Sequence, residues 1–337
     1  MKKIINVGDK VIGDGKITIQ SMTNTATTDI GNTVAQIRRL ADAGADFVRV
    51  SIPDKESAYA IKDIVNCSAI PLIGDIHFNY EPALIAIENG ISKIRINPSN
   101  FPEDGLQKLV NKCRDYNVAI RVGVNRGSVR RNVSADKLVD LTLEAAKKVE
   151  NCGWDKIVLA VKSSSVSDTV KAYRRLSSLT PYPLHIGLTE AGIGTMAYTK
   201  STIAIGALLF DGIGDTIRVS LTGDPVEEVY AAKNILRALN IDRNYVEIIS
   251  CPTCARTCID VEGLADRLTK LTSDVKKSVK IAVMGCVVNG IGEGQDADFG
   301  VAGGKERSVI FKSGKQEAIV DNDRIEETLI KLLEEYK

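Results

Sequence analysis

The chain has 337 residues, of which 44% are hydrophobic, and its 44 Lys and Arg residues nearly balance its 43 Asp and Glu residues. This length and apolar fraction suffice for two folded domains, and the balanced charge argues against a nucleic-acid-binding protein. The N-terminal segment has no apolar stretch of signal-peptide length, and no later stretch reaches the ~20 apolar residues of a membrane span. We therefore expect a cytoplasmic protein with neither a membrane nor a nucleic acid as partner.

Short β-branched runs alternate with amphipathic stretches from residue 17 onward, which is typical of βα units around a parallel sheet. Eight runs predict an α/β fold of the (β/α)₈ TIM-barrel type. The pattern changes after residue 240, so we predict a barrel over 1–240 and a small α+β domain over 245–337, with one strand at Lys280–Met284 and two more strands after a glycine-rich turn. The expected barrel strands are Ile17–Thr23, Phe47–Ile52, Pro71–Phe78, Lys93–Pro98, Val118–Asn125, Lys156–Lys162, Leu184–Glu190 and Thr216–Thr222.

Nearly every one of these runs ends in a charged or hydrogen-bonding side chain. In a barrel such ends gather on one face, where active sites are built. A single charge at a strand end is equally well explained by solvation, but repetition around the barrel predicts a binding site. Its several Arg and Lys residues favour a small phosphorylated substrate. The residues concerned are Gln20, Arg49, Asp75, His77, Arg95, Asn97, Arg121, Asn125, Lys162, Glu190, Arg218 and Ser220.

Seven cysteines are too few for a disulfide scaffold in a chain of this length, and four of them lie between residues 251 and 286. Cys251 and Cys254 form a Cys-x-x-Cys turn, and Cys286 follows the predicted strand Lys280–Met284. This arrangement indicates a metal centre. Ligand chemistry favours a [4Fe–4S] cluster, with zinc and thiol redox chemistry as open alternatives. We expect Cys258, the fourth thiol, to be a helix-start or core cysteine.

Several short motifs along nearly the whole chain belong to one set. They are Gln20–Thr25 (QSMTNT), Gly74–Phe78 (GDIHF), Lys93–Pro98 (KIRINP), Arg121–Asn125 (RVGVN), His185–Gly192 (HIGLTEAG), Arg218–Thr222 (RVSLT), Cys251–Cys254 (CPTC) and Met284–Glu293 (MGCVVNGIGE). This set resembles the 4-hydroxy-3-methylbut-2-enyl diphosphate synthase family of the non-mevalonate isoprenoid pathway, in its short two-domain bacterial form. The resemblance implies a barrel similar to that of dihydropteroate synthase and a C-terminal domain similar to a sulfite-reductase module.

The resemblance also implies an activity, which is the two-electron ring opening and dehydration of 2-C-methyl-D-erythritol 2,4-cyclodiphosphate. It implies a [4Fe–4S] cluster on Cys251, Cys254, Cys286 and Glu293, reduced flavodoxin or ferredoxin as electron donor, and a head-to-tail homodimer. Ile291 departs from the family pattern, where we expect Pro, and could loosen the loop that carries Glu293.

By the same resemblance, the cations at the strand ends hold the diphosphate. His77 would be a hydrogen-bond donor or proton source on the phosphate side, and Glu190 would hold a substrate hydroxyl and supply a proton for water loss. Asp75 and Gln20 would orient these groups. The implied diphosphate contacts are Arg49, Arg95, Arg121, Lys162 and Arg218, with Asn125 and Ser220 as neutral donors.

Two other functions remain open from the residues. A pterin-binding or methyl-transferring barrel with a structural zinc tail predicts a colourless protein that needs no reductant. A non-enzymatic electron carrier would use the cluster alone, and it would have no use for a cationic barrel mouth.

Overall fold

The computed structural model describes residues 2–76, 79–125 and 133–336. The chain divides into two compact units, Met1–Leu239 and Asn240–Lys337, and each unit has a hydrophobic core of its own. Within the described ranges, no helix is both long enough and apolar enough to cross a bilayer.

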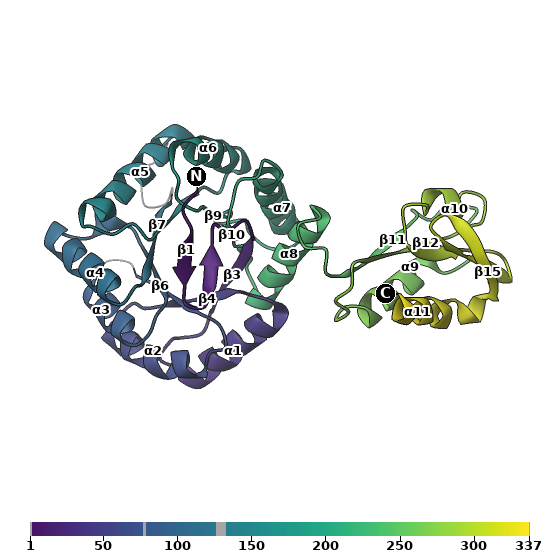
Figure 1. Cartoon of the computed structure of the whole chain (residues 1–337), viewed down its shortest axis with the longest axis horizontal. Helices are drawn as coiled ribbons and strands as arrows, with labels where there is room; N and C mark the ends of the chain where they lie inside the picture. The colour runs from purple at the N-terminus through teal and green to yellow at the C-terminus, as the bar shows by residue number, and fades with distance from the viewer. Residues whose placement is uncertain (1, 77–78, 126–132, 337) are drawn as a thin grey trace. The chain divides into compact units, whose positions relative to one another are not determined.

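The first unit is a nearly closed barrel of eight parallel strands, as predicted (Figure 1). The strands neighbour one another in the order β8-β7-β6-β5-β4-β3-β10-β9, and one parallel bridge between Leu159 and Leu184 joins the two ends of this series. Their bounds are β3 Thr18–Met22, β4 Phe47–Ser51, β5 Leu72–Asp75, β6 Lys93–Ile96, β7 Ala119–Asn125, β8 Ile157–Lys162, β9 His185–Ile186 and β10 Thr216–Ile217.

The strands β9 and β10 are shorter than the sequence predicts, since the predicted runs extend to Glu190 and Thr222. A Cβ atom on Gly187 would lie only 2.4 Å from the carbonyl oxygen of Arg218. The segments at Gly187 and Arg218 therefore approach so closely that only glycine fits at position 187. Beyond Ile186 and Ile217 the regular pairing of the two strands ends.

Eight helices alternate with these strands and surround the ring in Figure 1, among the described residues. Side chains of Asp29, Asp54, Ser134, Ser165 and Asp224 cap the N-termini of α1, α2, α5, α6 and α8. The helix bounds are α1 Ile30–Ala43, α2 Lys55–Cys67, α3 Glu81–Glu88, α4 Glu103–Asp115, α5 Ala135–Asn151, α6 Val166–Leu179, α7 Gly194–Phe210 and α8 Pro225–Ala238.

An antiparallel hairpin that the sequence pattern does not reveal precedes the barrel, β1 (Ile5–Val7) with β2 (Lys10–Ile12). Its apolar side chains share one buried cluster with residues at the amino ends of four barrel strands, namely Phe47, Ile73, Ala119 and Val158. The hairpin thus covers the amino ends, and the carboxyl ends remain for a site. Strands of three residues are too short for their alternation to predict them.

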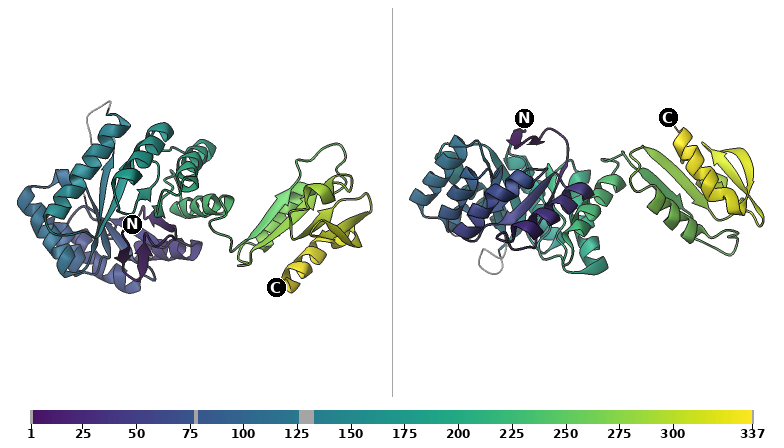
Figure 2. Two further views of the ribbon diagram at one scale, coloured as in Figure 1. Left: turned by 45° about the horizontal axis from the view of Figure 1, so that its top comes forward. Right: turned by 90° about the horizontal axis from the view of Figure 1, so that it is seen from below.

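The second unit is an α+β fold around a five-stranded sheet in the order β11-β12-β13-β14-β15 (Figure 2). The first three strands run parallel and the last two antiparallel. Leu268 of α9 and Leu329 of α11 are buried in its core. The bounds are β11 Val246–Ser250, α9 Val261–Leu271, β12 Val279–Met284, α10 Gly290–Glu293, β13 Phe299–Ala302, β14 Arg307–Lys312, β15 Lys315–Asp321 and α11 Ile325–Glu335.

The prediction of two strands after the glycine-rich turn is wrong, because three strands follow it. A tight turn at Ser313 and Gly314, both with positive φ, returns the chain as β15. Most of the β15 residues are exposed and polar. The strand therefore lacks the apolar run by which the other strands were predicted.

Candidate functional site

A small polar cavity of about 160 Å³ lies at the carboxyl ends of the barrel strands. Six of the predicted substrate-binding residues line it, and they come from β4, β6, β7, β8 and the segment after β10. Asp75, which was predicted to orient other site residues, lines it from β5. The lining residues are Arg49, Asp75, Arg95, Arg121, Gly123, Ala160, Lys162, Leu188, Thr189, Arg218 and Ser220. The fold thus brings five cationic side chains from distant parts of the sequence to one place.

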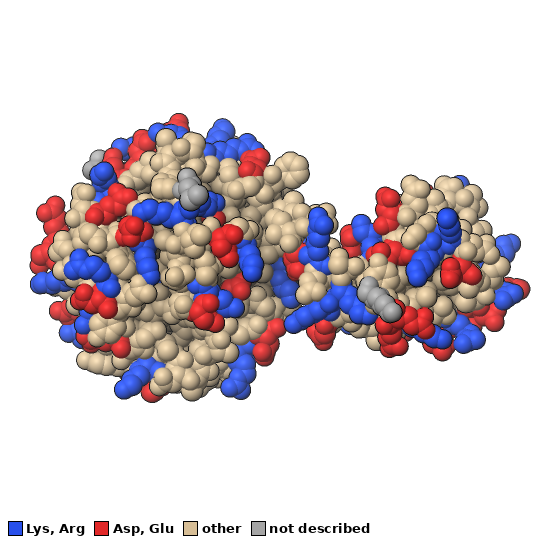
Figure 3. All heavy atoms as spheres, in the orientation of Figure 1, with Lys and Arg blue, Asp and Glu red and all other residues tan. Residues whose placement is uncertain are grey.

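Strand alternation explains why these cations converge. Residues two apart on a strand point to the same face, so Arg95 shares the barrel interior with Lys93, and Arg49 shares it with Phe47. The outer surface differs from this interior, because on the face shown in Figure 3 Lys and Arg are interspersed with Asp and Glu. The concentration of like charge is therefore a property of the barrel interior.

One carboxylate, that of Asp75, lies among these cations. Its Oδ2 is 3.8 Å from Arg49 Nε, and its Oδ1 is 3.5 Å from Arg95 Nη1. Burial lowers the pKa of Arg49 to about 10, although Asp75 opposes the shift; Arg218 and Arg95 add to it. Burial and the neighbouring arginines also hold the pKa values of Arg121 and Lys162 well below their ordinary values. Several positive charges that are buried away from water favour the binding of an anionic ligand.

A second carboxylate, which the sequence did not single out, contacts Arg218 from outside the cavity lining. Glu228 in the first turn of α8 is 4% exposed, and its two oxygens lie 3.2 Å from Arg218 Nε and 3.3 Å from Arg218 Nη2. The sequence did not reveal this contact, because Glu227 and Glu228 are adjacent in the first turn of α8.

Polar groups also fill the barrel interior around the cavity. Lys93, fully buried, has no hydrogen-bond partner for Nζ within the described part of the chain, and the same holds for both ring nitrogens of His185 and both amide atoms of Gln20. Arg121 lacks such partners for Nε and Nη1 among the described residues. Buried polar groups are normally hydrogen-bonded, so an unpartnered set of this kind is characteristic of a ligand-binding interior.

Three of the described strand-end residues, Gln20, Asn97 and Glu190, are not in the cavity lining. His77 lies outside the described residues, as does the side chain of Asn125, whose backbone ends β7. Glu190 is exposed and has a φ of 54°, a left-handed conformation that is uncommon for glutamate. Such backbone outliers cluster at functional sites.

The predicted metal ligands lie in the second unit, at the carboxyl ends of two neighbouring strands. Ser250 of β11 pairs with Val283 of β12, so Cys251 and the turn at Cys286 meet at the same sheet edge. The backbone N–H of Gly285 donates to Cys251 Sγ at 3.2 Å. Backbone N–H groups of Asn289 and Val288 lower the pKa of Cys286. Donors of this kind favour the thiolate form that a metal requires.

The cysteine side chains of the second unit do not form a complete metal-binding site in the described part of the chain. Across the described ranges, no group of three or more His, Cys, Asp and Glu side chains is placed to hold a metal ion. Cys254 and Glu293 are exposed. Ile291 packs against a small apolar cluster that includes Met284 and Phe311, and this contact anchors the turn that carries Glu293. The donor chemistry therefore fits an iron–sulfur centre, while the ligand geometry is open.

Cys258 is not a core cysteine, so that part of our expectation is wrong. It is exposed, its N–H donates to the Gly285 carbonyl oxygen at 2.8 Å, and it lies two residues before the α9 cap Asp260. Cys258 lies in the loop between the Cys251–Cys254 turn and α9, and this loop position leaves the thiol exposed.

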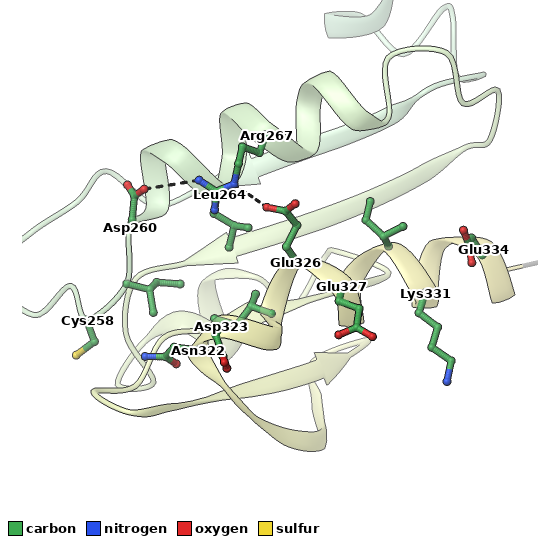
Figure 4. Close-up of a pocket in the computed structure, with 13 residues that line it drawn as sticks. Cys258, Asp260, Leu264, Arg267, Asn322, Asp323, Glu326, Glu327, Lys331 and Glu334 are labelled. Carbon is green, nitrogen blue, oxygen red and sulfur yellow. Dashed lines mark hydrogen bonds and ion pairs between the residues drawn. The ribbon is translucent and has the colours of Figure 1, made fainter.

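A larger hollow of about 1000 Å³ lies between α9 and α11 (Figure 4). Cys258 is at one end of it, and Arg267 spans it with ion pairs to Glu326 at 2.6 Å and Asp260 at 3.9 Å. None of the four predicted cluster ligands lines it. Its volume exceeds that of the barrel cavity, but it lacks convergent groups of one chemistry.

Family models match both units of the chain. The GcpE TIM-barrel domain matches residues 2–233, and the GcpE protein C-terminal domain matches residues 247–335. Two similar curated proteins carry the name 4-hydroxy-3-methylbut-2-en-1-yl diphosphate synthase (flavodoxin). The protein from Caldanaerobacter subterraneus subsp. tengcongensis is 48% identical over 98% of this chain and 96% of its own length. The protein from Thermotoga maritima is 47% identical over the full length of both.

Solved structures share the fold at low sequence identity. Dihydropteroate synthase from Thermus thermophilus covers 71% of this chain and 98% of its own, with a TM-score of 0.54 and 14% identity. Type I 3-dehydroquinate dehydratase from Clostridium difficile covers 72% of this chain and 99% of its own, also with a TM-score of 0.54 and 14% identity. These likenesses concern the barrel fold alone.

Proposed function

The chain belongs to the GcpE family of 4-hydroxy-3-methylbut-2-en-1-yl diphosphate synthases, and from this membership we propose how its two units divide the family's reaction between them. The protein is an enzyme of isoprenoid precursor biosynthesis. Its reaction takes up two electrons and two protons, opens the ring of 2-C-methyl-D-erythritol 2,4-cyclodiphosphate and releases one water to give the linear allylic diphosphate. Full-length relatives of this name favour this function over a pterin-binding or methyl-transferring barrel.

The barrel cavity binds the diphosphate in this proposal, and the convergence of five cations on it is the observation that carries the assignment. Arg49, Arg95, Arg121, Lys162 and Arg218 supply charge, and Ser220 supplies a hydroxyl. Guanidinium forks suit phosphate oxygens because they present paired N–H donors in one plane. Asp75 pairs with Arg49 and Arg95, so this one carboxylate links two of the guanidinium groups that line the cavity.

His77, Asn125 and Glu190 complete the barrel site in the proposal, on the family resemblance. His77 donates a hydrogen bond or a proton on the phosphate side, and Asn125 adds a neutral donor. Glu190 holds a substrate hydroxyl and supplies a proton for the loss of water. Its left-handed backbone supports this role, since it sets the carboxylate at the end of the strand segment that follows β9.

The second unit holds a [4Fe–4S] cluster on Cys251, Cys254, Cys286 and Glu293 in the proposal. When bound there, the cluster would relay to the substrate the two electrons that the external donor supplies. The N–H donors that face Cys251 and Cys286 support these two ligands, and the packed Ile291 supports the position of Glu293. A carboxylate is a weaker ligand for iron than a thiolate, so Glu293 would be the most readily displaced of the four ligands.

Flavodoxin is the electron donor in this proposal, since the relatives' names specify it. We further propose a head-to-tail homodimer in which the barrel of one chain works with the cluster unit of the other. This arrangement rests on the family resemblance, and in this chain the cation cavity and the cysteine turns belong to separate compact units.

Anaerobic purification with iron and acid-labile sulfide analysis tests the cluster assignment. We expect about four irons per chain in the wild type and in Cys258→Ala, with loss or alteration of the cluster spectrum in Glu293→Ala. One zinc per chain under iron-replete conditions would overturn the cluster and revive the transferase interpretation. Unchanged iron and spectrum in Glu293→Ala, with loss in Cys258→Ala, would instead assign the fourth ligand to Cys258.

A further inference from the structure

Glu228 occupies a position that the proposed reaction does not assign. It lies in the first turn of α8, whose cap is Asp224 and whose first residue is Pro225. Its side chain is 5% exposed, and each carboxylate oxygen accepts two hydrogen bonds. A buried carboxylate is costly unless its lone pairs are satisfied, and here four donors meet it. The four donors therefore satisfy both oxygens of the buried Glu228 carboxylate.

The contact with Arg218 fixes the plane of the guanidinium group. Glu228 Oε2 accepts from Arg218 Nε at 3.2 Å, and Oε1 accepts from Nη2 at 3.3 Å. The third nitrogen, Nη1, lies 3.7 Å from Met22 Sδ. A guanidinium has five N–H donors, so this bidentate contact uses one edge and leaves other donors for a ligand in the cavity that Arg218 lines.

The same carboxylate also accepts hydrogen bonds from the backbone after Ser220 and from a side chain of β3. Oε1 accepts from the Leu221 N–H at 3.1 Å, which fixes the chain directly after Ser220. Oε2 accepts from Ser21 Oγ at 3.2 Å, and Ser21 is the neighbour of Met22 at the end of β3. One side chain thereby links β3, the segment after β10 and α8. Because Glu228 does not line the cavity itself, it acts through these neighbours.

We propose that Glu228 is a positioning residue of the diphosphate site, which sets the orientation of Arg218 for the anion. This inference rests on the proposed function, since it assumes that the cavity holds the cyclic diphosphate. It predicts that the loss of one carboxylate oxygen lowers substrate affinity through Arg218 while the barrel stays folded.

The first test compares Glu228→Gln with Glu227→Gln, an exposed neighbour in the same helical turn. In Glu228→Gln, either amide orientation turns an NH₂ group toward one N–H of Arg218, so the bidentate contact is lost. We expect KM for the cyclic diphosphate to rise roughly 10-fold or more, as for loss of a charge-assisted hydrogen bond. The kcat value should stay within a factor of about two, because binding alone is affected. Glu227→Gln should match the wild type.

The second test places Glu228→Gln in an Arg218→Ala background and measures binding of the cyclic diphosphate by calorimetry. If Glu228 acts through Arg218, the double variant binds no more weakly than Arg218→Ala. Two additive losses, or a lower Tm in Glu228→Gln with unchanged affinity, would overturn the inference. Absence of binding to the folded wild type would overturn the proposed function, so the two failures are distinguishable.

Discussion

Lys93 Nζ lies 4.7 Å from the centroid of the Phe47 ring, inside the barrel and below the cation cavity. Phe47 belongs to the apolar cluster that the β1–β2 hairpin completes. The ammonium group therefore faces an aromatic ring in place of a hydrogen-bond acceptor, within the described residues. Burial, with Arg121 and Arg49 nearby, holds the pKa of Lys93 well below its ordinary value. The buried Lys93 side chain, unpartnered among the described residues, therefore destabilises the folded barrel.

Replacing Lys93 with Met should stabilise the free protein. The variant removes a buried unsatisfied polar group, and we expect the free energy of unfolding to rise by about 1–3 kcal/mol. Chemical denaturation at neutral pH measures it. The matched control is Lys171→Met, an exposed lysine on α6, which should change stability by no more than about 0.5 kcal/mol. A variant less stable than the wild type would contradict this explanation.

The advantage of Lys93→Met should depend on pH with a definite sign. A lysine whose folded pKa is lowered binds fewer protons in the folded than in the unfolded state over the interval below 10.5, the ordinary lysine pKa. The wild type therefore loses stability as pH falls through this interval, and the variant lacks that loss. Denaturation curves at several pH values should show the gap between the two proteins widening as pH falls, and a constant gap would exclude titration of Lys93.

Inorganic diphosphate should stabilise the wild-type barrel. A ligand that binds only the folded state raises the free energy of unfolding by about 2.7 kcal/mol at 100 times its Kd. We expect a higher Tm with diphosphate, a smaller shift at high salt, and little shift in Arg121→Met. Arg38→Met, which removes an exposed arginine on α1, is the control. An undiminished shift in Arg121→Met would place the anion elsewhere.

Mixing two inactive variants tests the proposed head-to-tail dimer. Arg121→Met inactivates the barrel site, and Cys286→Ala inactivates the cluster unit. If each barrel works with the partner's cluster, half of a random mixture is heterodimer and each heterodimer has one intact site, so activity should reach about one quarter of the wild type. If barrel and cluster of one chain work together, no mixture recovers activity.

The sequence predicted the barrel and most of its cavity for a physical reason. Interior residues recur at every second strand position, so Arg95 and Arg121 could be placed at the carboxyl end from their strands alone. Glu228 could not be found in this way, because a helical glutamate beside Glu227 gives no sign of which one is buried against Arg218. The burial of Lys93 could not be predicted either, since a lysine at the first position of a strand is normally exposed to solvent.

In the second unit, the placement of Cys251 and Cys286 at neighbouring strand ends was predictable, but the loops around them were not. Cys251 and Cys286 follow strands, and parallel pairing brings such ends together. The exposure of Cys258 depends on the loop that precedes α9, and no periodic pattern encodes that loop. The strand β15 escaped prediction because it is solvent-exposed along most of its length.

The most direct measurement is anaerobic turnover of 2-C-methyl-D-erythritol 2,4-cyclodiphosphate by the iron-loaded full chain with reduced flavodoxin, followed by ³¹P NMR. We expect the cyclic diphosphate signals to be replaced by those of the linear allylic diphosphate, with two electrons consumed for each product molecule. If protein with a full complement of iron and sulfide leaves the cyclic diphosphate unchanged, the division of labour between the cation cavity and the cysteine turns is wrong.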